Sequence, residues 1–176
     1  MAQAAGGTMA IGKQTKADVA GPTVCVAFRE HAEEAVTFYV SLFPNSQILH
    51  LVRSEGQGPM PKGAVIHAGF ELDGREFVAF DGGPTFSFAE GTSMMVTCEA
   101  QDEIDELWAK LTDGGEEGPC GWLKDRFGVS WQIIPAQLGQ MLGDPMAGNS
   151  AKATEAMMKM RKLDIATLER AYRSQS

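Results

Sequence analysis

The sequence AVIHAGFELDGREFVAFD, at residues 64–81, decides the fold. It holds two runs rich in apolar and β-branched residues, 64–72 and 75–81, which are typical of β-strands. Asp73-Gly74 separates the runs, and glycine tolerates the positive φ that a tight hairpin turn demands. The stretch therefore predicts a β-hairpin.

The segment before this hairpin predicts a strand, a helix and another strand. A short β-branched run at 23–28 indicates a strand, and 46–53 indicates a second one. Between them, apolar residues recur at helical spacing, at Ala32, Ala35, Val36, Tyr39, Leu42 and Phe43. Pro44 ends the helix because proline cannot continue it. The glycines and prolines of 54–63 indicate a loop before the hairpin.

The same order of elements returns in the second half of the chain. The predicted elements are a strand at 92–98, a helix at 101–112, a short strand at 116–120, and strands at 121–126 and 129–134. Superposing the halves puts Tyr39 on Trp108 and Gly74 on Gly128. We therefore expect an α+β domain of two βαβββ modules, 23–84 and 91–135. Each module would have one helix on one face of its sheet, so we expect the twin module to cover the other face.

The two ends of the chain lie outside this repeat. Residues 1–22 show no periodicity and predict a flexible tail. Residues 136–149 predict a linker, and Ser150 is a candidate cap for a C-terminal helix. That helix would carry an apolar stripe of Met157, Met160, Ile165, Leu168 and Tyr172. A methionine-rich stripe indicates a docking face, either onto the core or onto a second subunit.

Composition excludes several classes of function. The 176 residues include 23 acidic and 15 basic side chains, for a net charge of −8. This balance argues against nucleic acid and anionic membrane partners, which need clustered Lys and Arg. No apolar run reaches the roughly 20 residues of a membrane span, and no secretory signal is evident. We therefore expect a cytoplasmic protein. The three cysteines and three histidines show neither a disulfide framework nor a zinc motif.

Four segments resemble a known family. They are residues 32–46 around AEEAVTFY and LFPNS, residues 80–84 (FDGGP), residues 120–132 (CGWLKDRFGVSWQ) and residues 160–165 (MRKLDI). Together they resemble the PhnB-like, glyoxalase-related family, also catalogued as 3-demethylubiquinone-9 3-methyltransferase, of the vicinal oxygen chelate superfamily. The resemblance implies the glyoxalase/bleomycin resistance/dihydroxybiphenyl dioxygenase-like fold, a homodimer and a small-molecule ligand.

The resemblance implies no metal and no cofactor in this chain. Superfamily members that use a metal hold it with His and Glu, and the corresponding positions here are Val24, Val78, Ser93 and Gln132. Valine cannot coordinate, and neutral Gln and Ser are poor ligands for a divalent ion. S-adenosylmethionine-dependent transfer is also disfavoured. Neither Gly82-Gly83 nor Gly114-Gly115 opens a helix in a βαβ crossover, where such a cofactor is usually bound.

Candidate site residues follow from strand alternation. Gln132 shares a strand face with Ser130 and Ile134, whereas Trp131 and Ile133 take the helix side. Trp122 and Lys124 share a face, and the pair suits a planar or anionic small molecule. Ser93 and Asp81 are further candidate ligand-binding residues. Two alternatives remain open: Asp81 caps a turn, and residues 124–126 form a solvated rim.

Two functions remain in competition. In the first, the protein is a metal-independent enzyme of unknown reaction, with His67 as acid or base and Gln132 orienting the substrate. The alternative for His67 is a hydrogen-bonded strand histidine without a catalytic role. In the second, the protein is a non-catalytic, resistance-type protein that binds or sequesters a small molecule through aromatic side chains such as Trp122. Methyl transfer, which the family name suggests, is less favoured than either of these functions.

Overall fold

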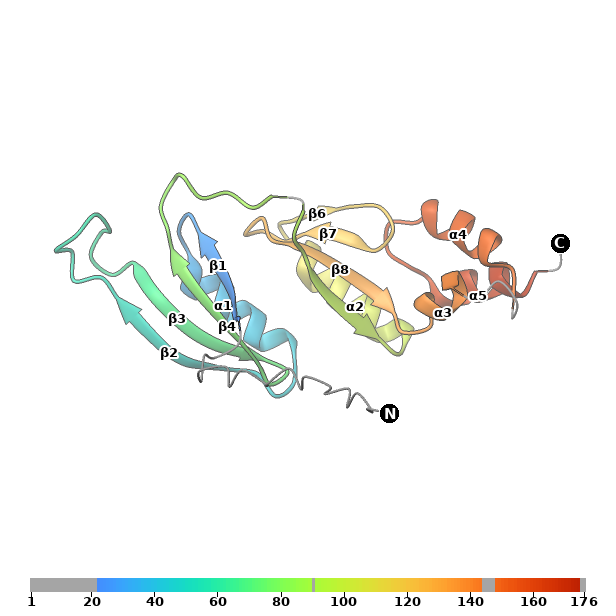
Figure 1. Cartoon of the computed structure of the whole chain (residues 1–176), viewed down its shortest axis with the longest axis horizontal. Helices are drawn as coiled ribbons and strands as arrows, with labels where there is room; N and C mark the ends of the chain where they lie inside the picture. Colours follow the sequence, from blue (N-terminus) through green and yellow to red (C-terminus); the bar gives the residue numbers. More distant parts are fainter. Residues whose placement is uncertain (1–21, 90, 144–147, 175–176) are drawn as a thin grey trace, which may run out of the picture.

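The computed structural model describes residues 22–89, 91–143 and 148–174 and contains two units built on the same plan (Figure 1). The first unit comprises β1 (Val24–Phe28), α1 (Ala32–Leu42), β2 (Gln47–Arg53), β3 (Val65–Leu72) and β4 (Arg75–Asp81). The second comprises β5 (Met94–Cys98), α2 (Gln101–Thr112), β6 (Glu116–Glu117), β7 (Trp122–Lys124) and β8 (Ser130–Pro135). The predicted repeat of βαβββ modules in an α+β fold is confirmed.

The two sheets have equivalent topology. Their strand orders are β1-β4-β3-β2 and β5-β8-β7-β6, and the first pair of each is parallel whereas the others are antiparallel. The register is also equivalent, since Val24 pairs with Phe77 and Met94 pairs with Trp131. Gly74 has φ 72°, as the predicted hairpin turn requires.

Each helix covers one face of its own sheet. The buried face of α1 consists of Ala32, Ala35, Val36 and Tyr39. That of α2 consists of Ile104, Trp108 and Leu111. Since residues paired across strands share a face, the row Val26, Ala79 and Ala68 is buried against α1. The opposite, helix-free face of each sheet is where candidate site residues lie.

The two units meet through α1 and not through their helix-free faces. Tyr39 and Phe43 contact the Trp131 ring, with centroids 5.3 and 6.0 Å away. Met95, on the helix-free face of the second sheet, remains 63% exposed. The expectation that each module covers the free face of its twin is therefore wrong within one chain. The apolar contacts between the units use the end of α1 and the helix side of β8 instead.

Asp125 is buried in this contact. Its carboxylate accepts hydrogen bonds from Tyr39 Oη, Trp131 Nε1 and the amides of Phe127 and Val129. The prediction of a solvated rim over 124–126 is wrong at Asp125, which is 3% exposed. A charged residue is buried here because four donors satisfy its oxygens.

In its described residues, the C-terminal segment has three helices, α3 (Leu138–Gly143), α4 (Ser150–Met158) and α5 (Ile165–Arg173), of which α3 lies in the predicted linker. The predicted single helix is interrupted because Asp164 starts a new one, accepting the Thr167 amide at 2.7 Å. Asn149, not Ser150, caps α4. Buried Leu163 and Leu168 join α3 and α4 in a second apolar cluster, against which Met157 and Met160 pack. The predicted tail lies, except for Pro22, outside the described residues.

Candidate functional site

His67 forms a pair with His50 on the helix-free face of the first sheet. His67 alternates with buried Ala68 on β3, so it points away from α1. His50 Nε2 lies 2.8 Å from His67 Nδ1, and the two rings are nearly parallel, 4° apart. Both histidines are exposed. The partner of His67 is therefore a second imidazole.

The register of β2 and β3 produces this pair. His50 is paired with Gly69 and Val52 with His67, so the two histidines are diagonal neighbours on one face. A Cβ at Gly69 would overlap the His50 ring. Glycine thus permits the ring of His50 to lie flat over the strand. His50 was not among the residues predicted from the sequence, because regular pairing of the two strands would put it opposite Ala68. The register shift between Ile48 and His50 moves it to Gly69.

Gln132 and Ser93 lie together on the second sheet. Gln132 Nε2 donates a 2.8 Å hydrogen bond to Ser93 Oγ. Gln132 is paired with Trp122 and Met95, so these residues share the helix-free face, as predicted. Gln132 and His67 belong to different sheets, whose free faces do not meet within the chain. The structure therefore does not bring together the two predicted catalytic residues.

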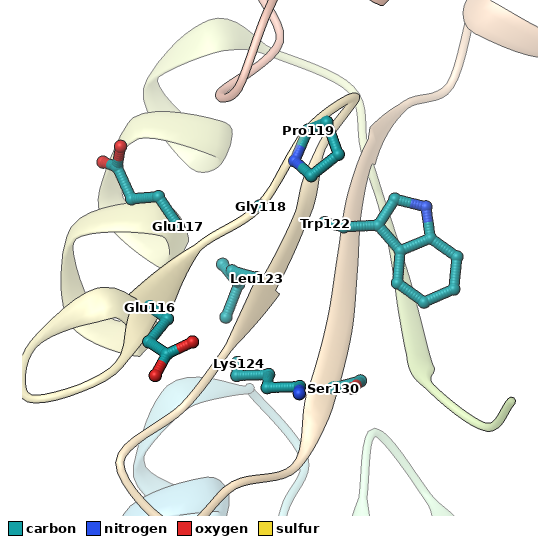
Figure 2. Close-up of a pocket in the computed structure, with 8 residues that line it drawn as sticks. All are labelled: Glu116, Glu117, Gly118, Pro119, Trp122, Leu123, Lys124 and Ser130. Atoms are coloured by element: carbon teal, nitrogen blue, oxygen red, sulfur yellow. The ribbon is translucent and has the colours of Figure 1, made fainter. Parts of the chain in front are cut away.

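Trp122 and Lys124 line a cavity of about 450 Å³ (Figure 2). Its other lining residues are Glu116, Glu117, Gly118, Pro119, Leu123 and Ser130. Trp122 and Pro119 supply apolar surface at one end, and Lys124 lies toward Ser130 at the other. Glu116 is directly opposite Lys124 across β6 and β7. Trp122 and Lys124 therefore line one cavity, as the sequence suggested, but Glu116 and Glu117 line it as well.

The Asp81 carboxylate is used within the fold, where it binds two backbone amides. Its two carboxylate oxygens accept hydrogen bonds from the amides of Ala32 and Val65, each at 2.8 Å. It is 9% exposed and caps the first turn of α1 from β4. This geometry supports capping, although of a helix and not of the predicted turn. Asp81 does not line the cavity of Trp122 and Lys124.

The cysteines differ in exposure and in reactivity. Cys98 is buried, and burial, followed by nearby Glu103, raises its thiol pKa to about 11. It is therefore protonated and a poor nucleophile at neutral pH. Cys25 is exposed, although its apolar, strand-like sequence context is typical of a buried thiol. Cys120 is partly exposed, and its Sγ lies 3.6 Å from Met158 Sδ.

Comparison with known proteins places the chain in a family. Residues 20–134 match the 3-demethylubiquinone-9 3-methyltransferase family. The PhnB protein from Bacillus cereus is 39% identical, with a TM-score of 0.61 over 65% of this chain and 98% of that one. The chain belongs to the 3-demethylubiquinone-9 3-methyltransferase (PhnB) family. No curated protein sequence matches it.

More distant structures share the fold of this PhnB-family chain. Protein PA1353 from Pseudomonas aeruginosa is 20% identical, with a TM-score of 0.55 over 66% of this chain and 98% of that one. A mutant of the fosfomycin resistance protein FosX from Listeria monocytogenes, complexed with Mn(II) and 1S,2S-dihydroxypropylphosphonic acid, is 14% identical. Its TM-score is 0.53 over 70% of this chain and 98% of that one. The glyoxalase-like fold predicted from the sequence is confirmed.

At the positions that the resemblance assigns to metal ligands, the described residues of this PhnB-family chain do not fit a divalent ion. Of the four positions that correspond to superfamily ligands, Val24 and Val78 have no donor atom, and Gln132 is hydrogen-bonded to Ser93. Elsewhere in the described ranges, no group of three His, Cys, Asp or Glu side chains is arranged to hold a metal.

Among the described helices, none has the length and apolar character to cross a membrane.

Proposed function

We propose that this PhnB-family chain is a metal-independent enzyme that acts on a small molecule, with His67 exchanging a proton with the substrate. The observation that carries the proposal is the hydrogen bond between His50 and His67 on an exposed sheet face. A histidine hydrogen-bonded to a second imidazole can pass a proton along the pair.

The pair can present either an acid or a base. When His50 carries a proton on both nitrogens and its Nε2 donates to His67 Nδ1, His67 can give its own Nε2 proton to a substrate and take the His50 Nε2 proton on Nδ1, which leaves both rings neutral. When His67 Nδ1 donates, its Nε2 is bare and can accept a proton. As an acid the pair therefore loses one proton to the substrate, and as a base it gains one, and exchange with water restores the starting form. The choice between acid and base depends on the substrate.

The test begins with a search for turnover. The purified protein is incubated with a small-molecule library and products are detected by mass spectrometry. On any substrate found, His67→Asn should lower kcat by about 100-fold or more, the usual contribution of acid–base catalysis. His31→Asn is a suitable control because His31 is exposed, lies outside the pair, and has a positive φ that Asn tolerates. Unchanged turnover in His67→Asn would exclude this role.

A second function is a non-catalytic protein that binds or sequesters a planar or anionic molecule. The cavity lined by Trp122 and Lys124 supports it, since that cavity contains no histidine and is on the sheet without His67. A ligand of this type should raise the unfolding temperature and be recovered unchanged. At 100 times its dissociation constant it would stabilise the fold by about 2.7 kcal/mol. Recovery of a covalent product would favour the enzyme.

We also propose a cytoplasmic homodimer. Met95 and Val52 are 63% and 46% exposed on the two helix-free faces, and a second copy would cover them. A two-fold partner would also let the His67 face of one chain approach the Gln132 face of the other. Sedimentation at micromolar concentration should then give the mass of a dimer. A monomer would leave His67 and Gln132 unable to act on one substrate.

Methyl transfer is not part of the proposal, despite the family's name. Each sheet has one parallel pair of strands, and neither glycine pair opens a helix after a strand. The backbone donors that usually hold a nucleotide cofactor therefore have no counterpart in the described ranges. S-adenosylmethionine should cause no shift in unfolding temperature. A saturable shift in unfolding temperature with S-adenosylmethionine would instead favour a methyltransferase.

A further inference from the structure

A second cavity, of about 470 Å³, lies where the two units meet. Three segments line it: residues 28–31 between β1 and α1, residues 86–88 after β4, and the β7–β8 turn with Lys124 and residues 126–128. Of the candidate site residues predicted from the sequence, Lys124 lines this cavity, whereas His67 and Gln132 do not. It adjoins the Trp122 cavity, because Lys124 lines both.

Basic side chains dominate this cavity. Arg29, Lys124 and Arg126 line it with one lining carboxylate, Glu30, and Arg126 also forms an ion pair with Glu34 at 3.7 Å. The balance is the reverse of that of the whole chain, whose net charge is −8. Across the described ranges, no carboxylate lies within ion-pair distance of Arg29. A cationic cavity in an acidic protein focuses a positive potential that attracts anions.

The two arginines are held in place. Arg29 Nε donates a 2.9 Å hydrogen bond to the carbonyl oxygen of Phe86. This bond fixes the guanidinium and leaves its two terminal nitrogens available to contact a ligand. The Arg126 guanidinium lies 4.4 Å from the ring centroid of Phe38 and 4.9 Å from that of Phe127. Stacking of this kind orients the planar group. Less side-chain freedom is then lost when a ligand binds.

Aromatic rings form the remaining wall. Phe28 packs edge-on against Phe88 and Phe127, with centroid distances of 5.4 and 6.3 Å. Phe28 is buried and belongs to the core, so this wall is anchored. Rings of this kind offer a face or edge to a flat apolar ligand, and the adjacent guanidinium groups can receive a carboxylate in bidentate geometry.

We propose that this cavity binds a planar aromatic carboxylate, with Arg29 as the principal anion contact and the phenylalanine wall against the ring. The site is distinct from the His50–His67 pair and from the Trp122 wall. The proposal therefore stands or fails independently of the proposed enzyme activity. A neutral ligand of the same shape would lose the charged contact and bind more weakly.

The probes are 2-naphthoate and its neutral counterpart 2-naphthamide, titrated calorimetrically into the full chain. We expect naphthoate to bind measurably and at least about tenfold more tightly than the amide, since hydrogen bonds between charged groups are worth about that factor. Arg29→Gln should weaken naphthoate at least about tenfold, and Arg29→Lys should weaken it less. Arg75→Gln is the matched control, because Arg75 is also exposed but does not line the cavity.

Three results would overturn the proposal. They are no binding of naphthoate at millimolar concentration, equal affinity for the amide, and equal affinity in Arg29→Gln. Trp122→Leu distinguishes the two cavities and should leave naphthoate affinity unchanged. Loss of binding in Trp122→Leu with retention in Arg29→Gln would assign the anion to the Trp122 cavity and also contradict the proposal. Circular dichroism of each variant establishes that it is folded.

Discussion

Tyr39 Oη, on α1 of the first unit, donates a 2.7 Å hydrogen bond to Asp125 Oδ2 in the second unit. The two residues are 86 positions apart, and both are buried. Asp125 Oδ2 also accepts from Trp131 Nε1 at 2.8 Å, so one carboxylate joins the two units through two aromatic side chains. This contact fixes how the units are placed and, with that, where the free faces and the cationic cavity lie.

Replacing Asp125 should destabilise the whole chain. Asp125→Ala leaves the hydroxyl of Tyr39, the indole N–H of Trp131 and two amides without their acceptor in a buried place. We expect a loss of about 2–4 kcal/mol in the free energy of unfolding, measured with urea. Asp113→Ala, at an exposed position, should stay within about 0.5 kcal/mol of the wild type. Equal stability of the two variants would refute the role given to Asp125.

Tyr39 should make the protein sensitive to alkaline pH. Burial, and then the charge of Asp125, raise its pKa well above the usual value of about 10. The unfolded chain loses this proton first, so the free energy of unfolding should fall as pH rises past about 10. In Tyr39→Phe the fall should be shallower, by up to about 1.4 kcal/mol per pH unit. Identical pH profiles for variant and wild type would contradict the prediction.

A methyl group at Gly69 should separate the two histidines. In Gly69→Ala the new Cβ overlaps the His50 ring, so His50 must turn away from His67. Imidazole ¹⁵N spectra should show loss of the shared hydrogen bond while the amide spectrum outside the first sheet is retained. Gly58→Ala serves as control, because a Cβ there meets no atom within 4 Å. An unchanged imidazole spectrum in Gly69→Ala would show that the pair does not depend on this glycine.

The cysteines should react with thiol reagents in an order set by burial. Cys98 is 2% exposed and has a pKa of about 11, so it should be labelled only after unfolding. Cys25 and Cys120 should react in the native protein, as measured by peptide mass spectrometry after iodoacetamide treatment. Native labelling of Cys98 as fast as Cys25 would mean that this core opens readily.

Chelation should leave the protein unchanged. With valines at two of the four superfamily ligand positions, EDTA should not shift the unfolding temperature by more than about 1 °C. Adding Mn(II) or Zn(II) should also have no effect. A rise of several degrees with either ion would require a metal site that the described side chains do not form.

Short-range sequence patterns were enough to predict the repeat of two βαβββ units. The period of apolar residues marked α1 and α2, Asp73-Gly74 marked the hairpin, and strand alternation placed Gln132 and Trp131 on opposite faces. These features depend on neighbours within a few positions, which is why they can be read from one chain. The C-terminal helix is the exception, since the cap at Asp164 divided a continuous apolar stripe.

The sequence alone determined the two βαβββ units and the resemblance to a family, and it placed valine at two of the four positions that this resemblance assigns to metal ligands. Only the tertiary structure decided the rest: that His50 joins His67, that Asp125 is buried instead of solvated, and that Asp81 caps a helix. Each of these depends on strand register or on packing between distant elements. The environment of a polar side chain is set by such long-range contacts, and its own neighbours in sequence do not encode them.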